Sequence, residues 1–493
     1  MNSSILLFLV QFLGFFIMIL CFIPRTEKKL LRLSTLICSI IILIFTLDLW
    51  YYFDKSYFGF QFQYNLLVLP EYNLNLSLGL DGISLLFLLL TVFIFPLCIF
   101  GAITIKENNK EFLIILLLIE FFLILSFLII NLFFFYVFFE SVLIPMFILI
   151  GIWGSRERRI KAAYYFFLYT VFGSFFLLFG ILYLYTVAQT TEYNILFNLY
   201  LTQQEQIFLW GFFFIPFAIK IPMFPFHIWL PEAHVEAPTI GSVLLASILL
   251  KLGGYGFLRF TIPLFAFGCE YYRNIIYLLG VISIIYASLS TIIQKDLKRL
   301  IAYSSIAHMN LIVLGLFSLT YQGLDGSIYL MLGHGIVSSG LFFCVGILYD
   351  RYHTRLLRNY SGLLSVIPLF SICFFLFTLA NMSFPGTSNF IGEFLIFAGI
   401  FEKNPYIMIL SGSGIVLSAI YSIWVYNKLM LGTLKTVNIL ENYTDLNRIE
   451  YYILIILLII MFALGINSDW ITSLSAFSIQ KISGCIELKA YIN

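Results

Sequence analysis

The chain alternates long apolar runs with short polar segments along most of its length. A helix of about 20 apolar residues crosses the hydrocarbon layer of a membrane, so each run of that length predicts one crossing. With charged residues, Pro, Gly and Asn taken as boundaries, the pattern predicts an all-α polytopic membrane protein with about 14 transmembrane helices. The predicted helices cover residues 5–23, 33–53, 83–104, 113–130, 132–153, 163–187, 207–226, 239–262, 274–293, 299–319, 326–348, 366–400, 407–431 and 450–466.

Composition agrees with a membrane protein. Of the 493 residues, 61% are hydrophobic and 11% are charged, and the mean hydropathy is +1.01. These values exclude an ordinary soluble domain. The seven cysteines are scattered and form no Cys-x-x-Cys pair, so iron–sulfur, zinc and disulfide frameworks lack support.

The basic residues predict an orientation, because loops on the cytoplasmic or matrix side carry the excess of Lys and Arg. Of the 27 Lys and Arg residues, six fall on the opposite, outer side: Lys55, Arg259, Arg273, Lys403, Lys481 and Lys489. Lys220 and Lys251 lie inside apolar runs, and the rest fall on the inner side. We therefore expect both termini on the outer side.

A faint internal repeat predicts how the helices are grouped. Residues 173–183 resemble residues 339–349, and a proline-interrupted span follows each copy. The copies lie in helices 6 and 11, so under the predicted topology they run in opposite directions, as in transporters built from inverted repeats. The expected parts are residues 1–110 (helices 1–3), 111–262 (helices 4–8, first inverted repeat), 263–431 (helices 9–13, second inverted repeat) and 432–493 (helix 14 and a tail), with helices 7 and 12 broken.

Lys220 lies in an apolar run that contains Pro222 and Pro225. Each proline lacks an amide donor and frees a carbonyl about one turn earlier, so the helix is expected to break beside a polar cavity. A buried ammonium group there can release and regain a proton. Glu140, in another apolar run, is the expected partner, because pairing eases the desolvation of both charges. The alternative for Lys220 is a side chain that extends to the membrane interface.

Lys251 is expected to be a second lysine on the same proton route. Gly253 and Gly254 follow it and allow neighbouring helices to approach closely. Its alternative is an inert charge shielded by a carbonyl group or by lipid. Glu120 is a further candidate for the route, and His227 is expected to extend it toward the inner side.

His308 and His334 lie in two later apolar runs, and imidazole is the side chain best matched to proton transfer near neutral pH. Glu393 follows the second expected break, which contains Pro385 and Gly386. We interpret the two histidines and the carboxyl as a relay. The alternative for each histidine is a structural role in the core.

The His227 and His234 spacing, with two glutamates nearby, raises the alternative of a metal site. We expect this segment to be a proline-rich loop without helical register, and we therefore reject zinc. The chain has no glycine-rich nucleotide loop, no histidine pair suited to haem and no arrangement typical of a catalytic nucleophile. No bound cofactor, metal or nucleic-acid partner is expected.

The segment 220–239, Lys-Ile-Pro-Met-Phe-Pro-Phe-His-Ile-Trp-Leu-Pro-Glu-Ala-His-Val-Glu-Ala-Pro-Thr, closely resembles the signature of the antiporter-like subunits of respiratory complex I. Phe-Glu-Ser around Glu140 and segments 250–256, 294–305 and 389–394 match in the same order, so the resemblance covers nearly the whole chain. Glutamate rather than lysine at position 393, together with fourteen spans and no long C-terminal lateral helix, resembles one of the three such chains of that complex rather than its two siblings. Asn131 departs from the aspartate that relatives often carry, but we expect it at a helix end.

The resemblance implies roles for six residues: a pair at Glu140 and Lys220, a central lysine at Lys251, linking histidines at His308 and His334, and an exit carboxylate at Glu393. It implies proton pumping driven by quinone reduction elsewhere in the complex, where other subunits hold NADH, FMN, iron–sulfur clusters and ubiquinone. The implied partners are other membrane-arm subunits, including the two siblings, and structural lipids.

The composition, rich in Phe, Tyr, Ile and Asn, resembles that of chains encoded by AT-rich mitochondrial genomes. We therefore expect the protein in the mitochondrial inner membrane, with a bacterial plasma membrane as the alternative. The rival functions are a subunit of a multi-subunit sodium/proton antiporter and a structural membrane scaffold.

Overall fold

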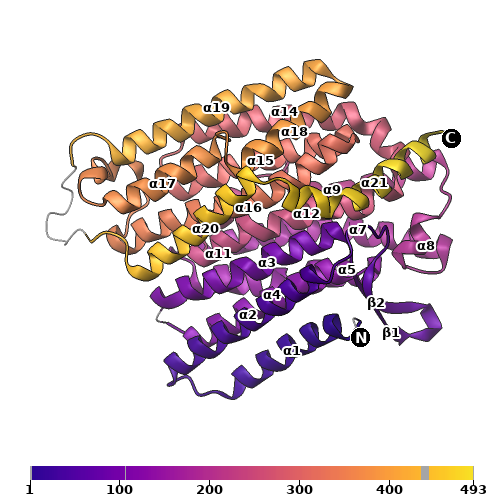
Figure 1. Ribbon diagram of the computed structural model, residues 1–493, viewed down its shortest axis with the longest axis horizontal. Coiled ribbons are helices and arrows are strands. Elements are labelled where there is room, and N and C mark those ends of the chain that lie inside the picture. The colour runs from indigo at the N-terminus through magenta and orange to yellow at the C-terminus, as the bar shows by residue number, and fades with distance from the viewer. Residues whose placement is uncertain (1–2, 106, 435–443, 492–493) are drawn as a thin grey trace. The chain divides into compact units, whose positions relative to one another are not determined.

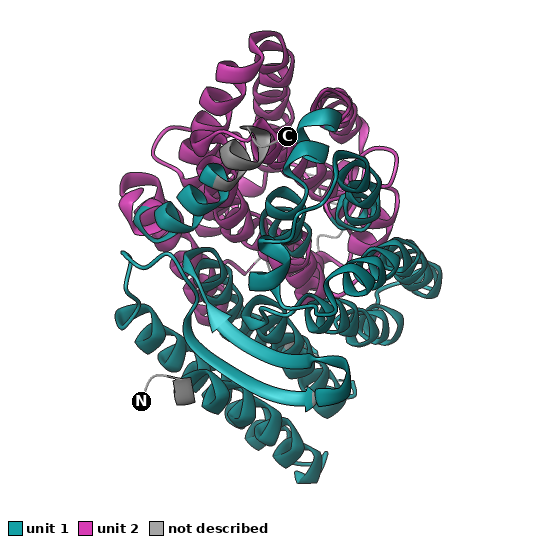
Figure 2. Cartoon of the chain, turned by 90° about the vertical axis from the view of Figure 1, so that its right-hand side faces the viewer, with its two compact units in different colours: residues 1–220, 251–272, 473–493 teal, residues 221–250, 273–472 magenta. Residues whose placement is uncertain are grey.

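The computed structural model describes residues 3–105, 107–434 and 444–491, which fold mainly into helices (Figure 1). Lys106 and Lys435, which the charge argument counts on the inner side, lie outside the described residues. Contacts divide the chain into two compact units, coloured separately in Figure 2. Unit 1 holds residues 1–220, 251–272 and 473–493, and unit 2 holds residues 221–250 and 273–472. The division into four parts by repeat stays a prediction.

Unit 1 contains the N-terminal helices and a β-hairpin. Its elements are α1 (Ser3–Phe22), α2 (Lys28–Tyr51), β1 (Gln61–Leu69), η1 (Pro70–Tyr72), β2 (Leu74–Leu80), α3 (Gly82–Gly101), η2 (Ala102–Thr104), α4 (Asn109–Leu128), α5 (Leu132–Ser141), α6 (Leu143–Trp153), α7 (Arg159–Ala188), α8 (Tyr193–Phe197), α9 (Gln203–Lys220), the π-helical η4 (Phe257–Thr261) and α13 (Ile262–Leu264).

Unit 2 is arranged around α16 (Tyr321–Tyr352), which contacts helices on several sides. The other elements that lie in unit 2 are α10 (Trp229–Glu236), α11 (Thr239–Leu244), the π-helical η3 (Leu245–Leu249), α15 (Leu297–Ser318), η5 (Leu357–Asn359), η6 (Leu363–Ser365), α17 (Pro368–Asn381), α18 (Ser388–Lys403), α19 (Pro405–Met430) and α20 (Arg448–Ile466). Three helices contribute residues to both units: α12 (Leu250–Gly256), α14 (Ala266–Ile293) and α21 (Asp469–Tyr491).

The apolar runs form helices because hydrocarbon offers no partner to a backbone N–H or C=O group, and a helix pairs these groups within its own segment. Among the described residues, 12 helices are long and apolar enough to cross a membrane. Both expected breaks are confirmed: α9 ends at Lys220, and residues 382–387 separate α17 from α18. Gly386 in the second break has φ +91°, a conformation that glycine adopts without strain.

One expectation for the segments between runs was wrong, and two basic residues that were counted by membrane side lie in helices. The expected loop before residue 239 contains α10, so His234 lies on a helix. Arg259, counted among outer-side residues, lies within η4 and is 5% exposed. Lys298, counted with an inner loop, lies in α15 and is also buried.

The β-hairpin and α21 were not expected. Strands β1 and β2 pair antiparallel and form a two-stranded sheet (Figure 2). A search for runs of about 20 apolar residues does not detect strands of this length or a helix as polar as α21. Both elements matter for unit 1, because they lie near the start of α3.

The start of α3 contacts α21 closely. Asp81 caps α3, since its side chain accepts a hydrogen bond from the Ser84 N–H and the Ser84 hydroxyl contacts the Asp81 N–H in return. A Cβ atom at Gly82 would lie 1.8 Å from the backbone oxygen of Leu474 in α21. Phe58 and Phe477 add an edge-to-face ring contact at 4.8 Å. Glycine at position 82 is therefore what allows α21 to pack here.

We predict that Gly82→Ala displaces α21, because the added methyl group meets a backbone carbonyl that cannot rotate away. In purified protein, trypsin should then cleave after Lys481 in α21 faster than in the unmodified chain. Gly151→Ala in α6 is the control, since no atom lies within 4 Å of a Cβ built there. Equal cleavage rates for the Gly82 variant and the control would contradict the packing role.

Candidate functional site

In unit 1, Lys220 lies over an aromatic ring and interacts electrostatically with Glu140. Lys220 is the last residue of α9 and is 2% exposed, and its Nζ lies 4.6 Å from the centroid of the Phe139 ring in α5. Glu140 follows Phe139, and its charge interacts electrostatically with Lys220. Neither Lys220 Nζ nor the buried Glu140 Oε1 has a hydrogen-bond partner among the described residues. The pair is therefore close enough to interact but not directly bonded, an arrangement that suits a bridging water.

Helix α9 ends at Lys220 because of the residues that follow. Pro222 and Pro225 cannot donate the amide hydrogen bonds that the next turn of helix needs. The ammonium group is consequently placed where the helix stops, beside backbone groups that no longer pair within a helix. This is the local structure that the proline pattern predicted.

Lys251 lies in α12, a short α-helical segment between two π-helical turns. It is completely buried in the chain. A π-helical turn inserts a residue into the helical ladder and is frequent at functional sites. The sequence placed Lys251 correctly inside an apolar span, but it gave no sign of the π-helical turns on either side.

His308, His334 and Glu393 come together in unit 2. The Nδ1 of His308 in α15 lies 3.0 Å from Oε1 of Glu393 in α18. The ring centroids of His308 and His334 in α16 are 5.6 Å apart. All three residues are at most 4% exposed, and His308 Nε2 has no hydrogen-bond partner among the described residues. The arrangement holds two imidazoles and a carboxyl close enough to exchange protons directly or through one water.

A pocket beside Glu393 includes polar residues that the sequence analysis did not single out. Ser411, Ser418 and Tyr421 of α19 line it together with His308 and Glu393. Spacings of seven and three residues place these three side chains on one face of a helix, and this pattern could have identified them from the sequence. The buried Tyr421 hydroxyl group is a further candidate for this cluster.

Glu120 and His227 are buried, but within the described residues no hydrogen bond, ion pair or ring contact joins either of them to the other site residues. Glu120 in α4 is 0% exposed, and both of its carboxyl oxygens lack a partner among the described residues. His227 lies between α9 and α10, with its ring 5.9 Å from Phe224 and 5.2 Å from Tyr286. Their part in a proton route stays a prediction.

The segment that raised the alternative of a metal site is largely helical. His234 in α10 stacks on Phe342, with ring centroids 4.8 Å apart. Among the described residues, no group of three or more His, Cys, Asp or Glu side chains is placed to hold a metal ion. Lys298 lies near the same segment, and its Nζ donates to the Ala237 carbonyl at 2.7 Å.

Arg259 forms a buried ion pair that the sequence analysis missed. Its Nη2 lies 2.5 Å from Oδ1 of Asp81, the residue that caps α3. Burial alone would raise the pKa of Asp81, but the Arg259 charge and several hydrogen bonds outweigh burial and lower the pKa. Asp81 therefore stays ionised, and the pair is permanent at neutral pH.

Comparison with known proteins identifies the family. The model of the NADH:quinone oxidoreductase/Mrp antiporter membrane domain matches residues 129–420. NADH-ubiquinone oxidoreductase chain 4 of Arabidopsis thaliana is 53% identical over 91% of this chain and 90% of its own length. The chain belongs to the chain 4 family of NADH-ubiquinone oxidoreductase. Chain 4 of Marchantia polymorpha is 50% identical, covering 94% of this chain and 93% of the relative.

Solved structures agree with this complex I family. A chain of respiratory complex I from Thermus thermophilus with bound NADH is 28% identical, with a TM-score of 0.88, and the match covers 99% of this chain and 100% of that one. A chain of the Mrp complex from Dietzia sp. DQ12-45-1b also has a TM-score of 0.88 over 100% of this chain and 99% of that one, but is 17% identical. The Mrp match shows a shared fold only. The protein is thus a multi-pass membrane subunit of a respiratory complex that has eukaryotic relatives.

We predict that His308 and Glu393 act as one unit. Gln at either position removes a titratable group, so the NADH:quinone reductase rate of His308→Gln/Glu393→Gln should fall little below that of the worse single variant. The control pair joins Glu393→Gln to His353→Gln at the C-cap of α16, about 28 Å along the helix from His334. Losses that add for both pairs alike would contradict the unit.

Proposed function

We propose that this chain is a proton-translocating membrane-arm subunit of NADH:ubiquinone oxidoreductase, coupling electron transfer to proton pumping through buried Glu, Lys and His residues. The observation that carries the proposal is the pair formed by the buried Lys220 and the half-buried Glu140, whose Oε1 is buried and has no direct hydrogen bond to Lys220. Two charged groups in direct contact keep their protonation states. Two groups that interact across a gap can gain or lose a proton when their surroundings change.

Each unit contributes its own set of exchangeable groups. In unit 1 these are Glu140, Lys220 and Lys251, with Glu120 as a further candidate. In unit 2 they are the cluster of His308, His334 and Glu393, with His227 as a further candidate. Protonation of one member changes the charge that the others experience, so a change in one group alters the proton affinity of its neighbours.

The electron-transfer chemistry belongs to other subunits under this proposal. They hold NADH, FMN, iron–sulfur clusters and ubiquinone, and quinone reduction there sends an electrostatic change along the membrane arm. The proposed partners are the other membrane-arm subunits, including two sibling antiporter-like chains, together with structural lipids. The proposed location is the mitochondrial inner membrane, with both termini on the intermembrane-space side.

We predict that Lys220→Met lowers the rate of NADH-driven proton uptake in vesicles that contain the assembled complex. The loss should reach about tenfold or more, since removing one positioned acid–base group typically costs more than about a hundredfold in the step that it serves. Glu140→Gln should behave alike, and the double variant should be little worse. Lys428→Met, at an exposed lysine near the end of α19, is the matched control and should pump normally.

The rival functions give different results in the same vesicles. A normal rate of NADH-driven uptake in both the Lys220 and Glu140 variants would contradict proton transfer through the pair and favour a scaffold. Uptake that persists without NADH or quinone and follows a sodium gradient would favour the antiporter subunit. The assembled complex is quantified by native gel before each measurement, so failed assembly is not read as lost pumping.

A further inference from the structure

Three side chains of the helix that carries Lys251 are spaced so that they share one face. Tyr255 and Arg259 follow Lys251 at intervals of four residues, and Arg259 lies about 12 Å beyond Lys251 along the helix. Arg259 Nε donates to the Tyr255 hydroxyl oxygen at 3.2 Å. The Tyr255 hydroxyl in turn donates to the Phe127 carbonyl at 3.4 Å. A polar series therefore leads from Lys251 toward the part of unit 1 that holds Asp81.

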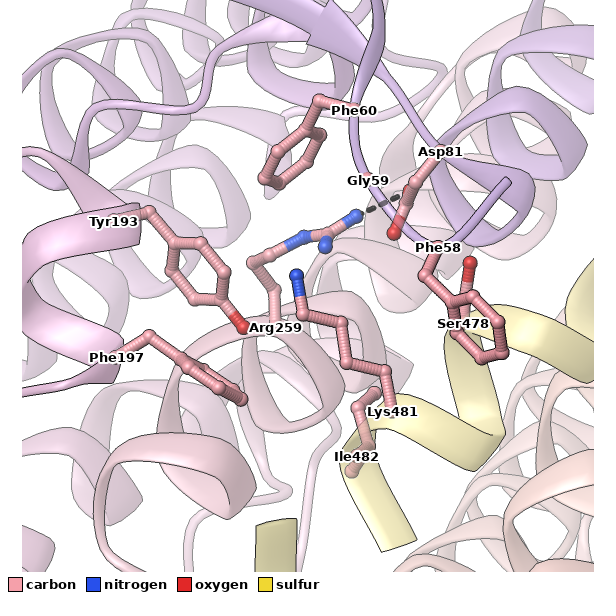
Figure 3. A pocket seen from close by; sticks show the side chains of 10 residues that line it. All are labelled: Phe58, Gly59, Phe60, Asp81, Tyr193, Phe197, Arg259, Ser478, Lys481 and Ile482. Atoms are coloured by element: carbon pink, nitrogen blue, oxygen red, sulfur yellow. Dashed lines mark hydrogen bonds and ion pairs between the residues drawn. The ribbon is translucent and has the colours of Figure 1, made fainter. Parts of the chain in front are cut away.

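Arg259 lies among three aromatic rings, two of which, Phe60 and Tyr193, are drawn beside it in Figure 3. Its guanidinium carbon is 5.0 Å from the centroid of the Phe60 ring, 5.7 Å from that of Tyr193 and 5.3 Å from that of Tyr255. Asp81 holds the guanidinium from the fourth direction. This arrangement combines cation–π contacts with a direct ion pair, so the arginine is fixed in place.

A second cation lies at the same place. Lys481 of α21 lines the small pocket that contains Arg259 and Asp81, and its Nζ is 5.3 Å from the centroid of the Phe197 ring. The side chain of Lys481 is drawn with its amine near the guanidinium in Figure 3. The two basic groups outnumber the one carboxylate among the charged residues that line the pocket, which therefore carries a net positive charge.

The donor and acceptor chemistry of this series blocks a proton. A hydroxyl group passes a proton along a series only if it donates to the next group. The single hydroxyl hydrogen of Tyr255 is instead donated to the Phe127 carbonyl oxygen, which lies outside the series. The next group, Arg259, has five N–H donors, no acceptor and no accessible neutral form. A proton that reaches Tyr255 from Lys251 therefore meets a donor-only group that carries a fixed positive charge.

We propose that Arg259, held by Asp81 and joined to Tyr255, is a barrier that stops protons from leaving Lys251 toward the end of unit 1 that carries the β-hairpin and α21. Under the predicted topology this is the outer side. The inference rests on the proposed function, because it assumes that Lys251 exchanges protons. Arg259 and Asp81 would then meet a requirement of translocation. If Lys251 were open to both sides of the membrane at once, protons that had been pumped would flow back through it.

The experiment measures passive proton flow through the complete complex in proteoliposomes, without NADH, under an imposed potassium diffusion potential and with a pH-sensitive dye inside. We expect Arg259→Gln to leak protons severalfold faster than the unmodified complex, because Gln is neutral and offers an acceptor. Arg259→Lys keeps the positive charge, and Asp81 beside it favours the protonated form, so this variant should leak less than Arg259→Gln. Arg259→Gln/Asp81→Asn removes both charges, so no unpaired buried charge is left to prevent folding, and it should leak as well.

A further variant shows where the leak runs. Adding Lys251→Met to Arg259→Gln/Asp81→Asn should close the leak, since the proposed path passes through Lys251. If vesicles with Arg259→Gln and with Arg259→Gln/Asp81→Asn both stay proton-tight, the proposed barrier at Arg259 is wrong. It is also wrong if the leak persists when Lys251 is replaced. Lys251→Met alone tests the proposed function separately: if its NADH-driven uptake is normal, translocation through Lys251 is wrong whatever the leak assay gives.

Discussion

A charge buried among apolar side chains must be compensated, and this constraint explains most of the irregular features of the structure. Moving an ion from water into a protein interior costs several kcal/mol even after relaxation. Arg259 and Asp81 meet the cost with a direct ion pair, and His308 and Glu393 with a direct hydrogen bond. Lys220 instead lies beside an aromatic ring and interacts with a carboxylate that it does not touch.

These different solutions correspond to different tasks. A group in a tight ion pair keeps its charge, whereas a group whose partner is separated by a gap changes protonation more readily. The fixed pair therefore suits a boundary, and the separated pair suits transfer. Unit 1 contains both kinds within the described residues, with Lys251 eight positions before Arg259 on one continuous helical segment.

The backbone is irregular at the positions where the exchangeable groups lie. Lys220 is at the end of α9, Lys251 lies between two π-helical turns, and Glu393 follows the break at residues 382–387. The two breaks were predictable because proline cannot donate the amide hydrogen bond that a helix interior needs. The π-helical turns were not, since no residue type specifies them and they arise from packing around the helix.

Most of the helices were predictable because their apolar runs have the length that crosses a membrane. The pairing of Arg259 with Asp81 was not predictable, because the two residues are 178 positions apart and no local pattern joins them. The hairpin and α21, which lie beside the cap of α3, were not predicted because their segments lack a long apolar run. Asn131, by contrast, is at the helix end where the sequence placed it and caps α5.

The most direct test of the account is a density map of the assembled complex at a resolution that shows ordered water. Proton transfer by Lys220 and Glu140 requires water in the gap between them, and the same holds at the pocket beside Glu393. We predict density for water bonded to Lys220 Nζ and to the Glu140 carboxylate. Dry apolar side chains filling the space between those two groups would contradict the central claim.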